Sequence, residues 1–169
     1  MLLALTLMGC DPDCGDTSRM DGDYVVWSHS AVTDDLVTGT NTADYPFRQI
    51  FVNGWSEWTI KYIPSKQSFQ LSVDGQAYEG TYEPDPNNCN NFSLVFQGTY
   101  STEADTAHSF LWQGDLSYLG VHIAGTFTYK DNWTDLATGV QGSLEIPAGE
   151  LTATLRSEVS EGGATDTGG

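Results

Sequence analysis

The chain has 169 residues, of which 39% are hydrophobic and 12% aromatic, and this is enough to build one domain with a real core. Its 23 acidic and 6 basic residues give a formal net charge of −17, which repels phosphate backbones, so we expect no nucleic-acid partner. Such a charge favours solubility, or a cationic partner such as calcium.

The chain begins with an apolar segment that carries no charge. It reads Met-Leu-Leu-Ala-Leu-Thr-Leu-Met-Gly, whereas a helix that spans a bilayer needs about 20 apolar residues. Residues 1–9 are therefore predicted to be a signal segment.

The end of this segment, Leu7-Met8-Gly9-Cys10, resembles the lipobox of bacterial lipoproteins, in which an aliphatic and a small residue precede an invariant cysteine. The resemblance implies cleavage after Gly9 and a diacylglycerol on the Cys10 thiol, usually with acylation of the new amino group. Two or three acyl chains would anchor the protein stably. The domain would then lie in the bacterial cell envelope, outside the cytoplasm, with its lipid in the inner or the outer membrane. The alternatives are an ordinary secretory signal, or a chance apolar start with Cys10 as a buried or paired thiol.

The chain has three cysteines, and lipid on Cys10 would leave Cys14 and Cys89 as a single pair. Both lie in segments rich in turn-forming residues. In an oxidising compartment, a disulfide between them would close a long loop and stabilise the fold by roughly 2–4 kcal/mol. Two free thiols are the alternative, because sequence alone does not show that the two residues meet.

The composition divides the mature chain into a polar tether at 10–21, a single domain at 22–156, and a disordered, acidic, glycine-rich tail at 157–169. Acidic residues in and after the tether alternate as calcium ligands often do, but the full twelve-residue calcium loop is absent. We interpret these side chains as solvated, and we expect no metal ion and no cofactor. The alternating acidic residues are Asp11, Asp13, Asp16, Asp21 and Asp23.

Short runs of Thr, Tyr, Val and Phe between turn residues, together with 18 glycines, indicate an all-β fold. Besides three hairpins, strands are predicted at 23–32, 48–53, 57–63 and 91–100. Two sets of side chains each share one apolar face: Trp58, Ile60 and Tyr62, and Phe92, Leu94 and Phe96.

The first hairpin is predicted to turn at the Asp-Gly pair of residues 74–75, which favours a two-residue turn. This register pairs Val73 with Gln76 and Leu71 with Tyr78. The second hairpin is predicted to turn at residues 119–120. Its expected pairs are Tyr118 with Val121, Leu116 with Ile123, Gly114 with Gly125, Trp112 with Phe127, and Phe110 with Tyr129.

A third hairpin is predicted at residues 147–149, which read Pro-Ala-Gly. It places the apolar residues of its first strand opposite those of its second strand. Leu144 and Ile146 lie on the first strand, and Leu151, Ala153 and Leu155 lie on the second.

About eight to ten antiparallel strands, each with one apolar face, most simply close into an up-and-down barrel without exposed edges. A two-sheet β-sandwich is the alternative. The start at residues 22–24 and the Gly-Thr-Tyr segments at 80–82 and 98–100 resemble lipocalin- and avidin-type barrels, and this resemblance implies a shape only.

The sequence lacks the common motifs of nucleophilic, zinc-dependent and phosphate-binding enzymes. We therefore expect a protein that is not an enzyme, and a hydrolase with two carboxylates is a less favoured alternative. Among the histidines, His122 is expected on a polar face. His108 begins an apolar-facing series and could line the interior, although a histidine at a strand end is the favoured interpretation.

Tryptophans give the best functional lead. Trp27, Trp58 and Trp112 fall at inward-facing positions and are predicted to be core residues. Trp55 and Trp133 lie beside turn residues, and loop tryptophans suit stacking on a sugar or an apolar ligand at a barrel mouth. Capping of an open barrel end is the other interpretation of these two.

These features predict a lipid-anchored, non-catalytic β domain that binds a small apolar or glycan ligand, or a protein partner. For a small ligand we expect a cavity of roughly a few hundred Å³ at one barrel end, touched by Trp55 or Trp133. The alternative is a purely structural or adhesive surface lipoprotein, with a packed interior and an exposed apolar patch outside.

Overall fold

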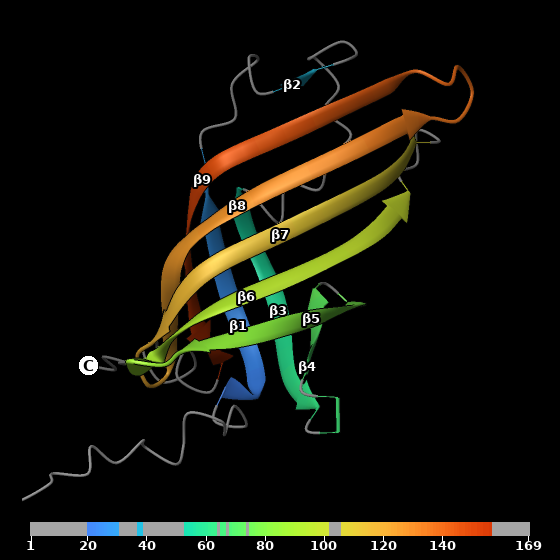
Figure 1. The fold of residues 1–169 in the computed structure, drawn as a ribbon. Coiled ribbons are helices and arrows are strands. Elements are labelled where there is room, and N and C mark those ends of the chain that lie inside the picture. The colour runs from blue at the N-terminus through green and yellow to red at the C-terminus, as the bar shows by residue number, and fades with distance from the viewer. Residues whose placement is uncertain are drawn as a thin grey trace, which may run out of the picture.

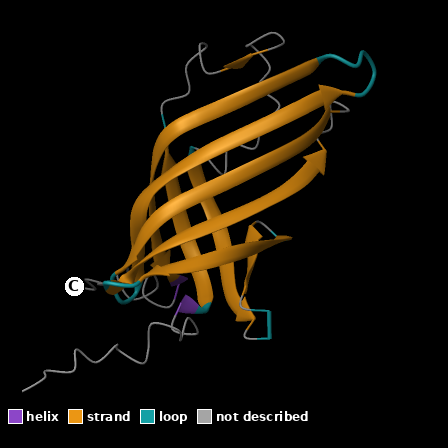
Figure 2. Cartoon of the chain, in the orientation of Figure 1, coloured by secondary structure: helices purple, strands orange, loops and turns teal. Residues whose placement is uncertain are grey.

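A computed structural model of the chain describes residues 20–30, 37–38, 53–63, 65–66, 68–73, 75–101 and 106–156. Within these ranges the protein is built from β-strands (Figure 2). The strands are β1 (Gly22–His29), β2 (Val37–Thr38), β3 (Gly54–Ile63), β4 (Ser68–Val73), β5 (Gln76–Asp85), β6 (Asn88–Ser101), β7 (Thr106–Tyr118), β8 (His122–Asp135) and β9 (Gln141–Leu155).

Eight of these strands form a closed, antiparallel up-and-down barrel (Figure 1). From β3 to β9 each strand pairs with the next one along the chain, and β1 closes the ring by pairing with both β3 and β9. Closure removes the free edges that an open sheet would expose. The short strand β2 joins β9 opposite Ser143 and Leu144. The predicted barrel is confirmed, and the alternative of a two-sheet sandwich is wrong.

The β4–β5 hairpin has the predicted register. Val73 pairs with Gln76 and Leu71 pairs with Tyr78. Gly75 takes a φ of +81° in the turn, a conformation that glycine adopts without strain. Turn chemistry and alternation agree in this hairpin, and together they determine both register and burial.

The β7–β8 hairpin differs from the prediction by a shift of two residues. Tyr118 pairs with Ile123 rather than with Val121. The two-residue turn lies at residues 120–121 rather than 119–120, because the Leu119 amide donates to the His122 carbonyl over 2.8 Å, and Gly120 takes a φ of +81° within it. A two-residue turn with a positive-φ glycine at its first position is a common hairpin connection, and moving the turn by one residue shifts the register by two.

A shift by two residues changes partners but leaves every side chain on its predicted face. Trp112 therefore stays inside, although it pairs with Tyr129 rather than with Phe127. Gly114 pairs with Phe127, so the predicted pairing of two glycines is wrong.

The predicted hairpin at residues 147–149 is also wrong, because these residues lie within the single strand β9. The register between β8 and β9 shifts between Phe127 and Tyr129, opposite this segment. Pro147 thus marks an irregularity in a continuous strand rather than a turn, and a proline is tolerated at such a point. The predicted strand at 48–53 lies outside the described residues except for Asn53, which precedes β3.

Aromatic side chains fill the middle of the barrel. The ring centroid of Trp112 lies 4.9 Å from that of Phe96 and 5.6 Å from that of Trp58. Beside Met20, the internal space that remains is about 10 Å³, which is at most the room that one water needs. Met20 is itself buried, and its carbonyl accepts a hydrogen bond of 3.0 Å from the Tyr24 hydroxyl.

Strands β6–β9 are the longest, and they run past their shorter neighbours toward the upper right of Figure 1. The last partner of β5 on this side of β6 is Phe96, and β1 pairs with β9 only from Glu150 onward. The ends of β6–β9 beyond these points form what we call the four-strand extension. It comprises residues 97–101, 106–111, 130–135 and 141–145.

Candidate functional site

The outer face of the four-strand extension carries eight small or polar side chains in two rows. Their inward neighbours Tyr100, His108 and Trp133 are buried, so the alternation of a strand directs the eight side chains outward. We call them the outer rows. In register order, the first row is Thr99, Ser109, Asn132 and Ser143, and the second is Ser101, Ala107, Thr134 and Gln141.

The outer rows line a groove with a volume of about 890 Å³. This falls within the range of about 300–1,000 Å³ that is typical of ligand sites. None of the eight side chains is charged, although the chain carries 23 acidic residues. Their hydroxyl and amide groups can both donate and accept hydrogen bonds.

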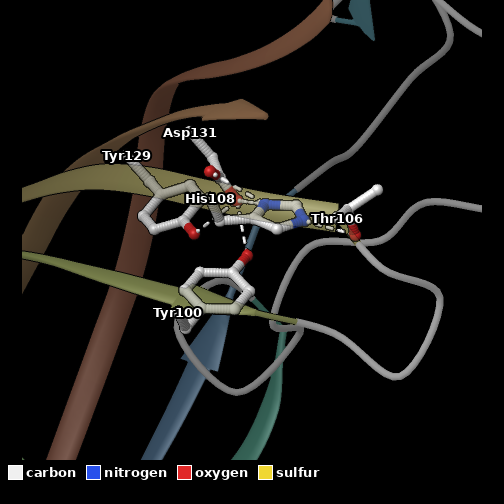
Figure 3. A network of polar contacts seen from close by, with 5 residues as sticks. All are labelled: Tyr100, Thr106, His108, Tyr129 and Asp131. Carbon is white, nitrogen blue, oxygen red and sulfur yellow. Dashed lines mark hydrogen bonds and ion pairs between the residues drawn. The ribbon is translucent and has the colours of Figure 1, made fainter. Parts of the chain in front are cut away.

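A buried polar network lies on the inner face of the same strands, with Asp131 at its centre (Figure 3). The hydroxyls of Tyr100 and Tyr129 donate to Oδ2 of Asp131 over 2.5 and 3.1 Å. Nδ1 of His108 lies 3.0 Å from the same oxygen, and its Nε2 lies 3.2 Å from Oγ1 of Thr106. The network therefore ties together β6, β7 and β8.

Burial governs the electrostatics of this network. The side chains of His108 and Asp131 have no exposed surface. Desolvation raises the pKa of the Asp131 carboxyl, and hydrogen bonds from Tyr100, His108 and Tyr129 offset part of that rise. Burial also raises the pKa of Tyr129, so its hydroxyl remains a donor. The single carboxyl group of Asp131 is thus the shared acceptor of three neighbouring side chains.

Thr106, His108 and Asp131 follow the hydrogen-bond order of a hydroxyl–imidazole–carboxylate catalytic relay. A nucleophile must be open to its substrate, however, and Thr106 is only 7% exposed. The geometry is better suited to holding strands together. Tyr100, His108 and Trp133 form one cross-strand line between the outer rows, so the network lies directly beneath the groove.

Trp133 does not lie in a loop, and this part of the prediction is wrong. It lies on β8 and is buried, with its ring centroid 5.8 Å from that of His108. Its indole covers Gly142 so closely that a Cβ added there would lie 2.4 Å from the ring. Trp133 still lines the groove, but the groove lies on the outer face of the strands, whereas the predicted site was a cavity at a barrel end.

His108 is the third residue of β7, so it lies near a strand end, and its side chain is buried in the network. Sequence reasoning missed Asp131 entirely. The alternation of Phe127, Tyr129 and Trp133 would have placed Asp131 inside, but the polar residues around it resemble a loop.

Trp55 lies on β3, faces outward and is 70% exposed. Trp27 pairs with it across the strands and also faces outward, so the prediction of Trp27 as a core residue is wrong. The ring centroids of the two tryptophans are 6.5 Å apart, and His29 stacks on Trp27 at 5.4 Å. We call Trp27, His29 and Trp55 the Trp55 patch. Trp58 and Trp112 are buried, as predicted.

The error at Trp27 has a simple cause. Residues 24–27 read Tyr-Val-Val-Trp, so both faces of this strand carry apolar residues and alternation does not identify the inner one. The structure buries Tyr24 and Val26 and leaves Trp27 outside. His122 lies on the polar face, as expected, where its Nδ1 is 3.0 Å from Oγ1 of Thr154.

Cys10 and Cys14 lie outside the described residues, and Cys89 lies on β6. Lipidation of Cys10 and the pairing of Cys14 with Cys89 therefore stay predictions. The same holds for the signal segment at 1–9 and the tail at 157–169.

Within the part of the chain that the structure describes, no group of three or more His, Cys, Asp and Glu side chains could hold a metal ion. Over the same ranges, no helix has the length and apolar character needed to cross a membrane. Comparisons with protein-family models, with curated proteins and with solved structures found no match to this chain. Its class is therefore defined by its fold, a closed antiparallel barrel of eight strands.

Proposed function

We propose that this chain is a bacterial envelope lipoprotein whose barrel binds a neutral glycan in the groove between the outer rows. Lipid on Cys10 would hold it to the inner or the outer membrane, and the barrel would serve as a binding domain without catalysis. The observation that carries the ligand class is the uncharged, hydroxyl- and amide-rich lining of the groove in a chain of net charge −17.

The lining favours a sugar over other ligands. Sugar hydroxyls pair in both directions with the side chains of Ser, Thr, Asn and Gln. An apolar ligand would leave these groups without partners, at a cost of about 1–3 kcal/mol for each buried group. An anionic ligand would be repelled by the overall charge.

The filled interior also supports binding on the outside. An apolar ligand within the barrel was one expectation from the sequence, but the space beside Met20 is only about 10 Å³. Trp58 and Trp112 occupy the middle of the barrel. A ligand of several sugar units fits the groove and not the core.

Calorimetric titration of the full chain with a panel of neutral oligosaccharides tests the proposal. For the best binder, we expect Asn132→Ala and Gln141→Ala each to weaken affinity about 2- to 10-fold, the equivalent of one lost hydrogen bond. Ser109→Trp places an indole in the groove and should abolish binding.

Gln70→Ala is the matched control, because Gln70 is an exposed amide on β4, away from the groove. Its affinity should equal that of the unchanged protein. Failure of every neutral oligosaccharide to bind, or unchanged binding by Ser109→Trp, would overturn the proposal.

The lipid anchor has an independent test. Intact-mass analysis of the chain expressed in a bacterium should give residues 10–169 plus acyl chains, and Cys10→Ser should remove the added mass. A mature form that retains residues before Cys10 would reject the anchor. Alkylation before and after reduction of the same sample reports whether Cys14 and Cys89 are paired.

A packed interior with an exposed aromatic patch outside is the combination expected of an adhesive surface protein. The Trp55 patch, with Trp55 70% exposed, therefore favours partner binding as a second role. This role is independent of the glycan groove, because the patch lies on β1 and β3.

A further inference from the structure

The Trp55 patch lies between two exposed carboxylates. Glu57 is two positions from Trp55 on β3, and Glu150 on β9 pairs with His29 on β1. Arg156 makes an ion pair of 2.9 Å with Glu57. Two aromatic rings of tryptophan and a flanking carboxylate, Glu150, therefore share one outward surface.

We propose that the Trp55 patch binds lysine or arginine side chains of a cationic polypeptide partner. The faces of indole rings attract cations that come within about 6 Å of the ring centroid, and tryptophan is the strongest of the aromatic residues in this respect. The rings of Trp27 and Trp55 are 6.5 Å apart and inclined by 49°. One cation can therefore lie within reach of both rings.

Charge complementarity identifies the partner. The chain has a net charge of −17, which accelerates association with a cationic protein and opposes association with an anionic membrane. The same charge opposes pairing of this face with a second copy of the chain. Exposed tryptophans at a surface are also the residues that most often dominate protein–protein binding.

The Trp55 patch is separate from the groove. Its residues lie on β1 and β3, while the outer rows lie on β6–β9. The two sites can therefore be tested separately, and loss of one binding activity does not predict loss of the other.

The test titrates the full chain with a short peptide of alternating lysine and glycine, and with the same peptide after acetylation of every lysine. Only the unmodified peptide should bind, and its affinity should fall as salt is added. Trp55→Ala should weaken binding about 10-fold, within the range of cation–π contributions. Glu150→Gln should weaken it about two- to fivefold, as expected for an exposed charge.

Two control variants separate the patch from the general charge of the protein. Glu83→Gln removes an exposed carboxylate on β5, and Leu119→Ala removes an exposed apolar side chain from the β7–β8 turn. Neither should change affinity by as much as its counterpart in the patch. Far-UV circular dichroism of each variant confirms that it is folded.

Three results would overturn the proposal. Equal effects of Glu83→Gln and Glu150→Gln would show that the peptide is held by the overall field. Equal binding of the acetylated peptide would exclude recognition of a cation. A neutral oligosaccharide that loses affinity in Trp55→Ala but not in Asn132→Ala would show that the patch is itself the glycan site.

Discussion

Replacement of Asp131 by alanine removes the acceptor at the centre of the buried network. Three groups, the hydroxyls of Tyr100 and Tyr129 and Nδ1 of His108, would lose this acceptor inside the barrel. Each unsatisfied buried donor costs about 1–3 kcal/mol, and relief of the desolvated carboxyl offsets part of this sum. We expect the free energy of unfolding to fall by about 3–5 kcal/mol, as found when one partner of a buried pair is removed.

Urea denaturation followed by far-UV circular dichroism measures this loss by linear extrapolation. Tyr129→Phe keeps the ring and removes one hydrogen bond to the carboxyl group, so it should cost roughly 1.5–3 kcal/mol. The matched surface control is Glu145→Gln, which breaks the exposed 2.8 Å ion pair with Lys130 and should cost at most about 1 kcal/mol.

The rank order of the three losses in unfolding free energy tests whether the network holds the strands together. If Asp131→Ala costs no more than Glu145→Gln, the three donors find other partners and the network does not hold the strands. Asp131→Ala could also cost several kcal/mol while the glycan binds with unchanged affinity and still loses affinity when Asn132 is replaced. The network would then stabilise the barrel without setting the spacing of the groove.

Three further predictions concern single positions. Gly142→Ala places a Cβ 2.4 Å from the Trp133 indole and should lower the free energy of unfolding by about 1–3 kcal/mol, and with it the melting temperature. A melting temperature equal to that of the unchanged protein would show that the indole moves aside. Burial raises the pKa of Tyr24 from 10.0 to about 12, so the folded state keeps a proton that the unfolded state loses. Its stabilising effect is complete below pH 10 and is lost as the pH rises toward 12, and Tyr24→Phe should flatten urea midpoints measured across that window. Trp55 is 70% exposed, so Trp55→Phe should remove most of the fluorescence that acrylamide quenches; equal quenching in the variant would place Trp55 under cover.

Sequence alternation identified the inner face wherever one face of a strand was clearly polar. Leu71, Val73 and Tyr78 were predicted inward and are buried, because each alternates with polar neighbours. In β1 both faces are apolar, and the choice made for Trp27 was wrong. Packing across the barrel decides which face of β1 turns inward, and the sequence of that strand alone does not specify this face.

Register required the length of each turn as well as the pattern of faces. The Asp-Gly pair at 74–75 specifies a short turn, and its register was correct. Residues 119–121 carry no such pair, and the turn lies one residue later than predicted, which displaced every partner by two positions. At residues 147–149, proline and glycine within one strand imitated a turn, because the same residues serve both turns and bulges.

The groove could not be derived from the sequence, because its residues come from four strands and are unremarkable in each. Single serines and threonines on the polar face of a strand indicate only solvent exposure. The candidate ligand residue Trp133 packs beneath the proposed groove rather than beside a loop.

The period of a β-strand links the buried network to the groove. On β7, Ala107 and Ser109 belong to the outer rows, and His108 between them belongs to the network. On β8, Asn132 follows Asp131 directly, so outward and inward functions alternate along one backbone. A substitution in an outer row should therefore change binding at constant stability, whereas one in the network should change stability, and binding with it if spacing matters. Comparison of Asn132→Ala with Tyr129→Phe in both assays separates recognition from positioning, because the two residues are three positions apart on one strand but lie on opposite faces of it.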